Sequence, residues 1–129
     1  PDAVKGINIE KQANKVHFLT GLLFGNNVEK GKVAAEIIIH YEDSSQQVFP
    51  LRAKVDIFDY WIHEEERRKV IESLDVEKIG WIGTCARGNG RALTKYSWEN
   101  PHPDKKISHV DFQGGLAITA PFLVAITIE

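Results

Sequence analysis

Apolar residues gather in short runs along this chain, and polar turns separate the runs. Residues 16–24 are apolar at nearly every position and are followed by a Gly-Asn-Asn sequence. A run of this kind is typical of a strand that is buried on both faces or that bends between two sheets. Residues 32–41 alternate instead between apolar and polar positions, which predicts a strand with one buried face.

The clearest local prediction is a hairpin over residues 32–55. Residues 42–45 read Glu-Asp-Ser-Ser and form a polar turn, and residues 47–55 resume an apolar pattern. Two apolar runs joined by a short polar link are the signature of paired antiparallel strands. Pro50 has no backbone N–H to give to a ladder, so we expect its strand to lie at a sheet edge or to carry a bulge.

The pattern changes once, near residues 63–74. Three glutamates precede three basic residues there, and apolar residues then repeat at helical spacing, so we expect one short helix. A second hairpin is predicted from residues 77–85 and 91–98, joined by a tight glycine turn at 87–90.

The last third of the chain returns to strands. Two prolines make residues 100–104 a loop, residues 107–112 alternate cleanly, and residues 122–128 form a final strand. Together the runs predict an all-β chain: one antiparallel β-sandwich of the jelly-roll type, with one short helix, spanning residues 1–129 as a single domain. The expected core residues are Ile37, Ile39, Leu51, Trp81, Val110, Phe112, Leu123 and Ile126.

The composition excludes several classes of function. The chain has 129 residues with 16 basic and 18 acidic side chains, a formal charge of −2, so no basic surface favours nucleic acid. Its single cysteine excludes an internal disulfide framework and a multi-cysteine zinc site. No apolar stretch approaches the ~20 residues that span a bilayer, so membrane insertion is not expected. We expect the chain to be a piece of a larger protein.

No pattern predicts a catalytic site. The five histidines occur singly, without the i, i+2 or i, i+4 spacing of metal ligands, so we expect no metal and no other cofactor. Carboxylate pairs can be drawn from 18 acids in many ways and therefore carry no signal. A small cupin-like metalloprotein stays open only because of the histidine count.

Aromatic and planar polar residues give the best candidate for a binding site. Phe58, Tyr60 and Trp61 crowd one segment, and sugar sites often stack an aromatic ring on a pyranose while polar groups hold the hydroxyls. The alternative is structural, because tryptophans in a small sandwich usually belong to the core. The candidate ligand-binding residues are Asp56, Asp59, Tyr60, Trp61, Arg87, Asn89, Trp98 and Asn100. Six of them are expected to lie together at one end or rim of the sandwich: Asp56, Asp59, Trp61, Arg87, Asn89 and Asn100.

The order and spacing of several segments resemble a known family. They are 17–19, 37–43, 49–51, 55–61, 81–84, 98–103, 107, 110–112 and 120–127. The stretch ending in Tyr60-Trp61 and the Trp-Glu-Asn-Pro-His-Pro stretch are the most specific. The chain is similar to the carbohydrate-binding-like jelly-roll domains attached to bacterial glycoside hydrolases and to anti-sigma-factor-like envelope proteins. Members of that family usually carry more strands ahead of the first run here.

The resemblance implies a non-catalytic glycan-recognition module, extracellular or periplasmic, that binds a polysaccharide or oligosaccharide. The alternative is a structural or protein-interaction sandwich that packs on a catalytic partner. A jelly roll that begins late is expected to expose a strand edge, which favours a homodimer or contact with a domain of the parent enzyme.

Overall fold

The computed structural model describes residues 2–62, 76–86, 90–115 and 118–129. The helix expected near 63–74 lies outside these residues. The described chain is mostly strand, with 3₁₀ turns at Gly25–Asn27 and Val76–Lys78. Its strands are β1 (Ala3–Lys11), β2 (Lys15–Leu23), β3 (Val33–Tyr41), β4 (Gln46–Arg52), β5 (Trp61–Ile62), β6 (Ile79–Thr84), β7 (Gly90–Glu99), β8 (Ile107–Gly114) and β9 (Ala120–Ile128).

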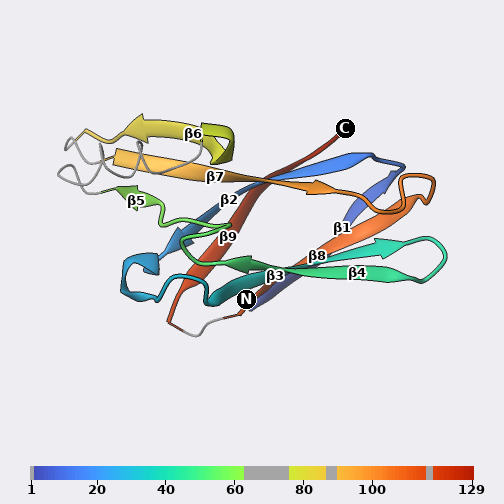
Figure 1. Ribbon diagram of the computed structural model, residues 1–129, viewed down its shortest axis with the longest axis horizontal. Coiled ribbons are helices and arrows are strands. Elements are labelled where there is room, and N and C mark those ends of the chain that lie inside the picture. The colour runs from blue at the N-terminus through green and yellow to red at the C-terminus, as the bar shows by residue number, and fades with distance from the viewer. Residues whose placement is uncertain (1, 63–75, 87–89, 116–117) are drawn as a thin grey trace.

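The strands form two antiparallel sheets that share one core (Figure 1). The first sheet has the order β1-β8-β3-β4. The second has the order β5-β7-β2-β9, with β6 paired to the other edge of β7. The predicted all-β sandwich is confirmed. The jelly-roll connectivity is not confirmed by these strand orders and stays a prediction.

Both predicted hairpins are present. β3 and β4 pair from Val33↔Arg52 to His40↔Gln46, and Pro50 lies on β4 at the edge of the first sheet, as expected. β6 and β7 form the second hairpin. Its glycine turn includes residues 87–89, which lie outside the described residues.

β1 was not predicted from the sequence. It pairs with β8 through two register shifts, between Val4 and Ile7 and between Asn8 and Lys11. Gly6 and Glu10 have positive φ angles of 71° and 54° at these irregular places. A bulge adds a residue to one strand, so the apolar and polar alternation breaks and the period-two signal is lost.

The run at residues 16–24 gives β2, which lies inside the second sheet. β7 pairs with one of its edges and β9 with the other. The predicted exposed edge, which was the reason for expecting a homodimer, is therefore not found on this strand. Among the described residues no helix is long and apolar enough to cross a membrane.

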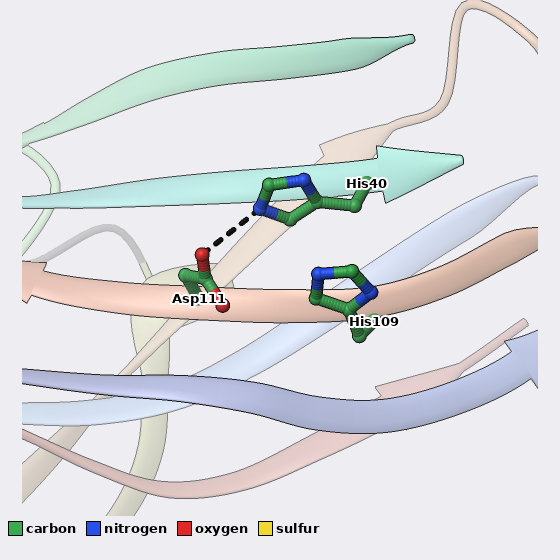
Figure 2. Close-up of side chains that lie close together, drawn as sticks. All are labelled: His40, His109 and Asp111. Carbon is green, nitrogen blue, oxygen red and sulfur yellow. Dashed lines mark hydrogen bonds and ion pairs between the residues drawn. The ribbon is translucent and has the colours of Figure 1, made fainter. Parts of the chain in front are cut away.

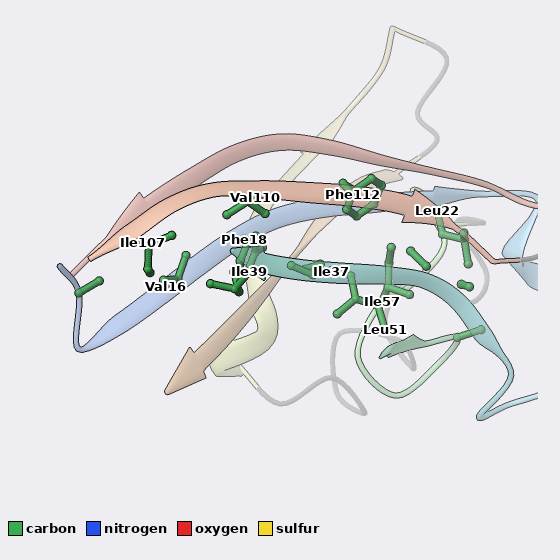
Figure 3. Close-up of a cluster of buried hydrophobic side chains, with 14 of the residues drawn as sticks. Val16, Phe18, Leu22, Ile37, Ile39, Leu51, Ile57, Ile107, Val110 and Phe112 are labelled. Atoms are coloured by element: carbon green, nitrogen blue, oxygen red, sulfur yellow. The ribbon is translucent and has the colours of Figure 1, made fainter. Parts of the chain in front are cut away.

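The core lies between the two sheets, where side chains of β2, β3 and β8 meet (Figure 3). Of the eight predicted core residues, Ile37, Ile39, Leu51, Val110 and Phe112 are buried, and Leu123 and Ile126 are partly buried against the cluster.

The prediction for Trp81 was wrong, since 47% of its surface is exposed. β6 changes register between Ile79 and Trp81, so Trp81 pairs with Leu93 and projects from the outer face of the sheet.

Candidate functional site

A groove of about 600 Å³ opens on the outer face of the second sheet. The second sheet is antiparallel, and the outer face of such a sheet is commonly polar, so an exposed apolar area on it is a marker of a binding surface. We call this surface the aromatic groove, and its lining residues are Leu19, Leu23, Tyr60, Gly80, Trp81, Leu93, Phe122 and Val124.

Glycines let the aromatic rings of the groove lie close to the sheet. A Cβ atom on Gly21 would overlap the ring of Phe122, which crosses it from the neighbouring strand β9. A Cβ atom on Gly83 would lie 2.5 Å from two atoms of the Trp81 indole, two residues earlier on the same strand. Gly80 gives the same room to Leu19. The missing Cβ atoms turn a pleated surface into a flatter platform that carries the Phe122 and Trp81 rings.

One predicted site residue, Tyr60, lines this groove, and its neighbour Trp61 follows it in the chain. Tyr60 lines it and packs its ring against the edge of Phe122, with centroids 5.6 Å apart. Trp61 is 44% exposed, and the Arg91 guanidinium lies 3.2 Å above its ring centroid and 5.7 Å from that of Tyr60. Arg91 therefore joins the two aromatic residues at the rim of the groove.

Asp59 fixes the backbone beside this rim. Its Oδ1 accepts a hydrogen bond from the Trp61 backbone N–H at 2.7 Å, and its Oδ2 accepts one from the Asn26 N–H at 3.1 Å. Asp59 thus positions the segment that carries Tyr60 and Trp61, which is an Asx-type role within the chain.

Trp98 and Asn100 do not join them. Trp61 pairs with Arg91 at the start of β7, whereas Trp98 and Asn100 lie at its far end, a strand length away. The expectation of one shared rim was wrong for Asn100, because sequence proximity to a tryptophan does not tell which end of a strand a loop occupies. Arg87 and Asn89 lie outside the described residues.

Three of the predicted residues have clear packing duties. Trp98 stacks on Phe49 with centroids 5.3 Å apart, beside the core between the sheets. Asp56 is 8% exposed and accepts hydrogen bonds from the backbone and the guanidinium of Arg52. Asn100 is 7% exposed, accepts a hydrogen bond from the Tyr41 hydroxyl and donates one to the Ala13 carbonyl.

Sequence reasoning missed Trp81 and Phe122 as groove residues. The available signal was the segment Gly80-Trp81-Ile82-Gly83, where glycines flank an aromatic residue at strand spacing. Glycine inside a strand often marks the close approach of another group, and here that group is an aromatic ring.

A second cluster lies on the outer face of the first sheet and consists of His40, His109 and Asp111 (Figure 2). We call it the histidine–aspartate cluster. His40 Nε2 lies 2.9 Å from Asp111 Oδ2, and the two imidazoles stack with centroids 4.2 Å apart and planes 12° from parallel. One nitrogen of each ring and one carboxylate oxygen all lie within 4.8 Å of one another.

Neighbouring groups hold this cluster in place. Asp111 Oδ1 accepts a hydrogen bond of 2.8 Å from the backbone N–H of Gly6, which lies in the bulge of β1. His109 Nδ1 lies 2.9 Å from the Ser108 hydroxyl. Burial disfavours the charged form of Asp111, but the hydrogen bonds from Gly6 and His40 outweigh it and hold the pKa of this carboxyl below its ordinary value.

The histidine spacing in the sequence hid this cluster. His40 and His109 are 69 positions apart but are directly opposite each other in the ladder between β3 and β8. Asp111 follows His109 by two residues and shares its face. Only the strand register brings the three together, and that register cannot be read from local spacing.

A third polar group lies on the second sheet. His17 Nδ1 is 2.7 Å from the Ser97 hydroxyl, and its Nε2 is 2.7 Å from a carboxylate oxygen of Glu129. The hydrogen bond from His17 lowers the pKa of Glu129. The contacts resemble a serine–histidine–acid arrangement, but none of the three residues lines the aromatic groove. We interpret them as a surface hydrogen-bond network.

Comparisons of this chain with models of protein families, with curated proteins and with solved structures found no match. The resemblance to carbohydrate-binding-like domains therefore stays a prediction from the sequence.

Proposed function

We propose that this domain is a non-catalytic glycan-recognition module and that the aromatic groove is its ligand-binding surface. The observation that carries the proposal is the glycine-supported platform of Trp81 and Phe122, because Trp81 keeps nearly half of its surface exposed there. An exposed aromatic ring in a small domain loses stabilising burial unless a ligand covers it.

The chemistry of a pyranose ring suits this platform. One face of the sugar is lined by C–H groups and packs well on an indole or phenyl ring, while its hydroxyls need polar partners. Tyr60 contributes a hydroxyl to the groove, and Arg91, held over Trp61, brings guanidinium donors to the rim. We extend the proposal to a secreted or periplasmic protein that processes glycans, in which this domain holds the substrate.

The test is affinity gel electrophoresis of the whole chain through a panel of soluble polysaccharides, followed by titration of the one that retards it. Trp81→Ala should weaken binding at least about tenfold, since a central aromatic contact is commonly a large part of such an interface. The matched control is Ile82→Ala, the next residue on β6, which is also exposed but does not line the groove. Equal loss in both variants, or full binding by Trp81→Ala, would contradict the assignment.

One observation favours a second candidate, a surface for a protein partner. The Tyr60 hydroxyl and the Trp81 indole N–H are the only polar side-chain groups among the groove's lining residues. A surface this apolar also fits the core of a protein interface. Absence of retardation by the whole panel, with Trp81-dependent binding to a purified glycoside hydrolase catalytic domain, would support this candidate instead.

A further inference from the structure

The histidine–aspartate cluster contains the donor set of a mononuclear metal centre. Two imidazole nitrogens and one carboxylate oxygen are typical protein ligands of zinc and of related divalent transition metals, with a fourth position left to water. From this donor set and its geometry we propose that His40, His109 and Asp111 bind one divalent transition metal ion, Zn²⁺ being the best match. The site lies on the opposite sheet from the aromatic groove, so it is independent of glycan binding.

The distances are compatible with a small rearrangement. Ligand atoms of a tetrahedral zinc centre lie roughly 3.3 Å apart, given zinc–ligand bonds of about 2.0–2.1 Å. His40 Nε2 and Asp111 Oδ2 are already 2.9 Å apart, and no pair of donor atoms exceeds 4.8 Å. The atoms therefore need to move by an ångström or two, which side-chain rotation supplies without a change in the sheet.

The rings must turn for the metal to bind. Stacked imidazoles have parallel planes, so their in-plane lone pairs do not meet at one point. Rotation of the His40 ring brings its Nε2 lone pair toward that of His109, and the 25% exposure of the His40 side chain leaves room for this motion. Metal binding would thus exchange the His40–Asp111 hydrogen bond for bonds from both residues to the metal.

The surroundings already orient two of the three ligands. The Gly6 N–H donates a hydrogen bond to Oδ1 of Asp111. The Ser108 hydroxyl pairs with Nδ1 of His109, which leaves Nε2 of that ring for a metal. Such supporting hydrogen bonds fix ligand orientation and tautomer in metal sites. The ladder partners on the outer strands are Asn8 beside His109 and Gln46 beside His40, both uncharged, so no cation lies directly opposite either ligand.

The experiment is titration of the purified chain with Zn²⁺ by calorimetry, and with Co²⁺ by absorption spectroscopy to report the coordination geometry. We expect one equivalent to bind, with the visible bands of a tetrahedral Co²⁺ centre that Zn²⁺ displaces. His109→Ala and His40→Ala should each weaken binding at least about tenfold and remove the bands.

The matched control is His17→Ala. His17 is likewise an imidazole on an outer sheet face, hydrogen-bonded to a carboxylate, but within the part of the chain that the structure describes it belongs to no cluster of potential metal ligands. This variant should keep the full stoichiometry and affinity. A circular dichroism spectrum like that of the unchanged chain shows that each variant is folded. Absence of stoichiometric binding, or equal binding by His109→Ala and His17→Ala, would overturn the proposal, whatever the glycan experiments show.

Discussion

Asp111 illustrates how much one residue on a sheet surface can be constrained. Each of its carboxylate oxygens accepts a hydrogen bond, one from a backbone N–H in the β1 bulge and one from His40 on the neighbouring strand. Its side chain is only 13% exposed although it points away from the core. These bonds favour the ionised form, so the pKa of Asp111 is lower in the folded chain than in the unfolded one.

This lowered pKa predicts a pH dependence of stability. The folded state binds the Asp111 proton less readily than the unfolded state, so the ionised group stabilises the native fold above the ordinary value of 3.8. That contribution is lost as the pH falls through the lower folded pKa. In Asp111→Asn the free energy of unfolding should be lower near neutral pH and should fall less on acidification. Urea denaturation at a series of pH values measures both effects.

The control for this prediction is Asp104→Asn, which neutralises an exposed carboxylate in a loop. It should keep the acid-induced loss of stability seen in the unchanged chain. The same loss in Asp111→Asn would mean that Asp111 does not contribute to the pH dependence.

Strands β2 and β9 pack closely at one point, where a glycine of β2 faces an aromatic ring of β9. Phe122 of β9 lies over Gly21 of β2, where no side chain can stand. We predict that Gly21→Ala costs about 1–3 kcal/mol, because the added methyl forces the ring or the strands apart. In a Phe122→Ala background the same substitution should cost much less. A double-mutant cycle by chemical denaturation gives the coupling, and purely additive effects would argue against this packing.

The sequence predicts elements well where pairing is regular and poorly where it is not. The alternation in residues 32–55 and the glycine turn after residue 85 identify both hairpins, because turn chemistry and period-two patterning agree there. Register shifts break the alternation of apolar and polar residues in β1. In β6 a register shift puts Trp81 on the outer face of the sheet, whereas the sequence pattern predicts the inner face. The aromatic groove and the histidine–aspartate cluster both depend on register between distant strands, which no local pattern contains.

The Asn100 side chain connects the two sheets by hydrogen bonds at one end of the sandwich. It follows β7 of the second sheet, and its side-chain oxygen accepts a hydrogen bond of 2.6 Å from Tyr41 of β3 in the first sheet. Its side-chain nitrogen donates to the Ala13 carbonyl between β1 and β2. Burial raises the pKa of the Tyr41 hydroxyl, as expected for a group that bonds inside the protein.

We therefore predict that Asn100→Ala destabilises the fold by about 1–3 kcal/mol, because it leaves the buried Tyr41 hydroxyl and the Ala13 carbonyl without partners. Tyr41→Phe in the Asn100→Ala background should recover part of the loss, since the orphaned hydroxyl is then gone. Thermal or urea unfolding measures both. Glycan binding at the groove should be unchanged in folded Asn100→Ala, whereas loss of binding alone, without loss of stability, would return Asn100 to the list of ligand residues.

The position of β8 between β1 and β3 has a consequence for how the chain is made. A ribosome releases β1 and β3 long before β8. Ala3 of β1, for example, cannot pair until its ladder partner Gln113 has been synthesised. Until β8 emerges, β3 lacks the strand that pairs with one of its edges, and its apolar face lacks the core side chains that β8 contributes. The first sheet thus assembles only after β8 has left the ribosome, and the nascent chain passes through a period in which unpaired strands are open to wrong partners. Chaperone demand during translation should accordingly peak in the interval before residues 107–114 emerge.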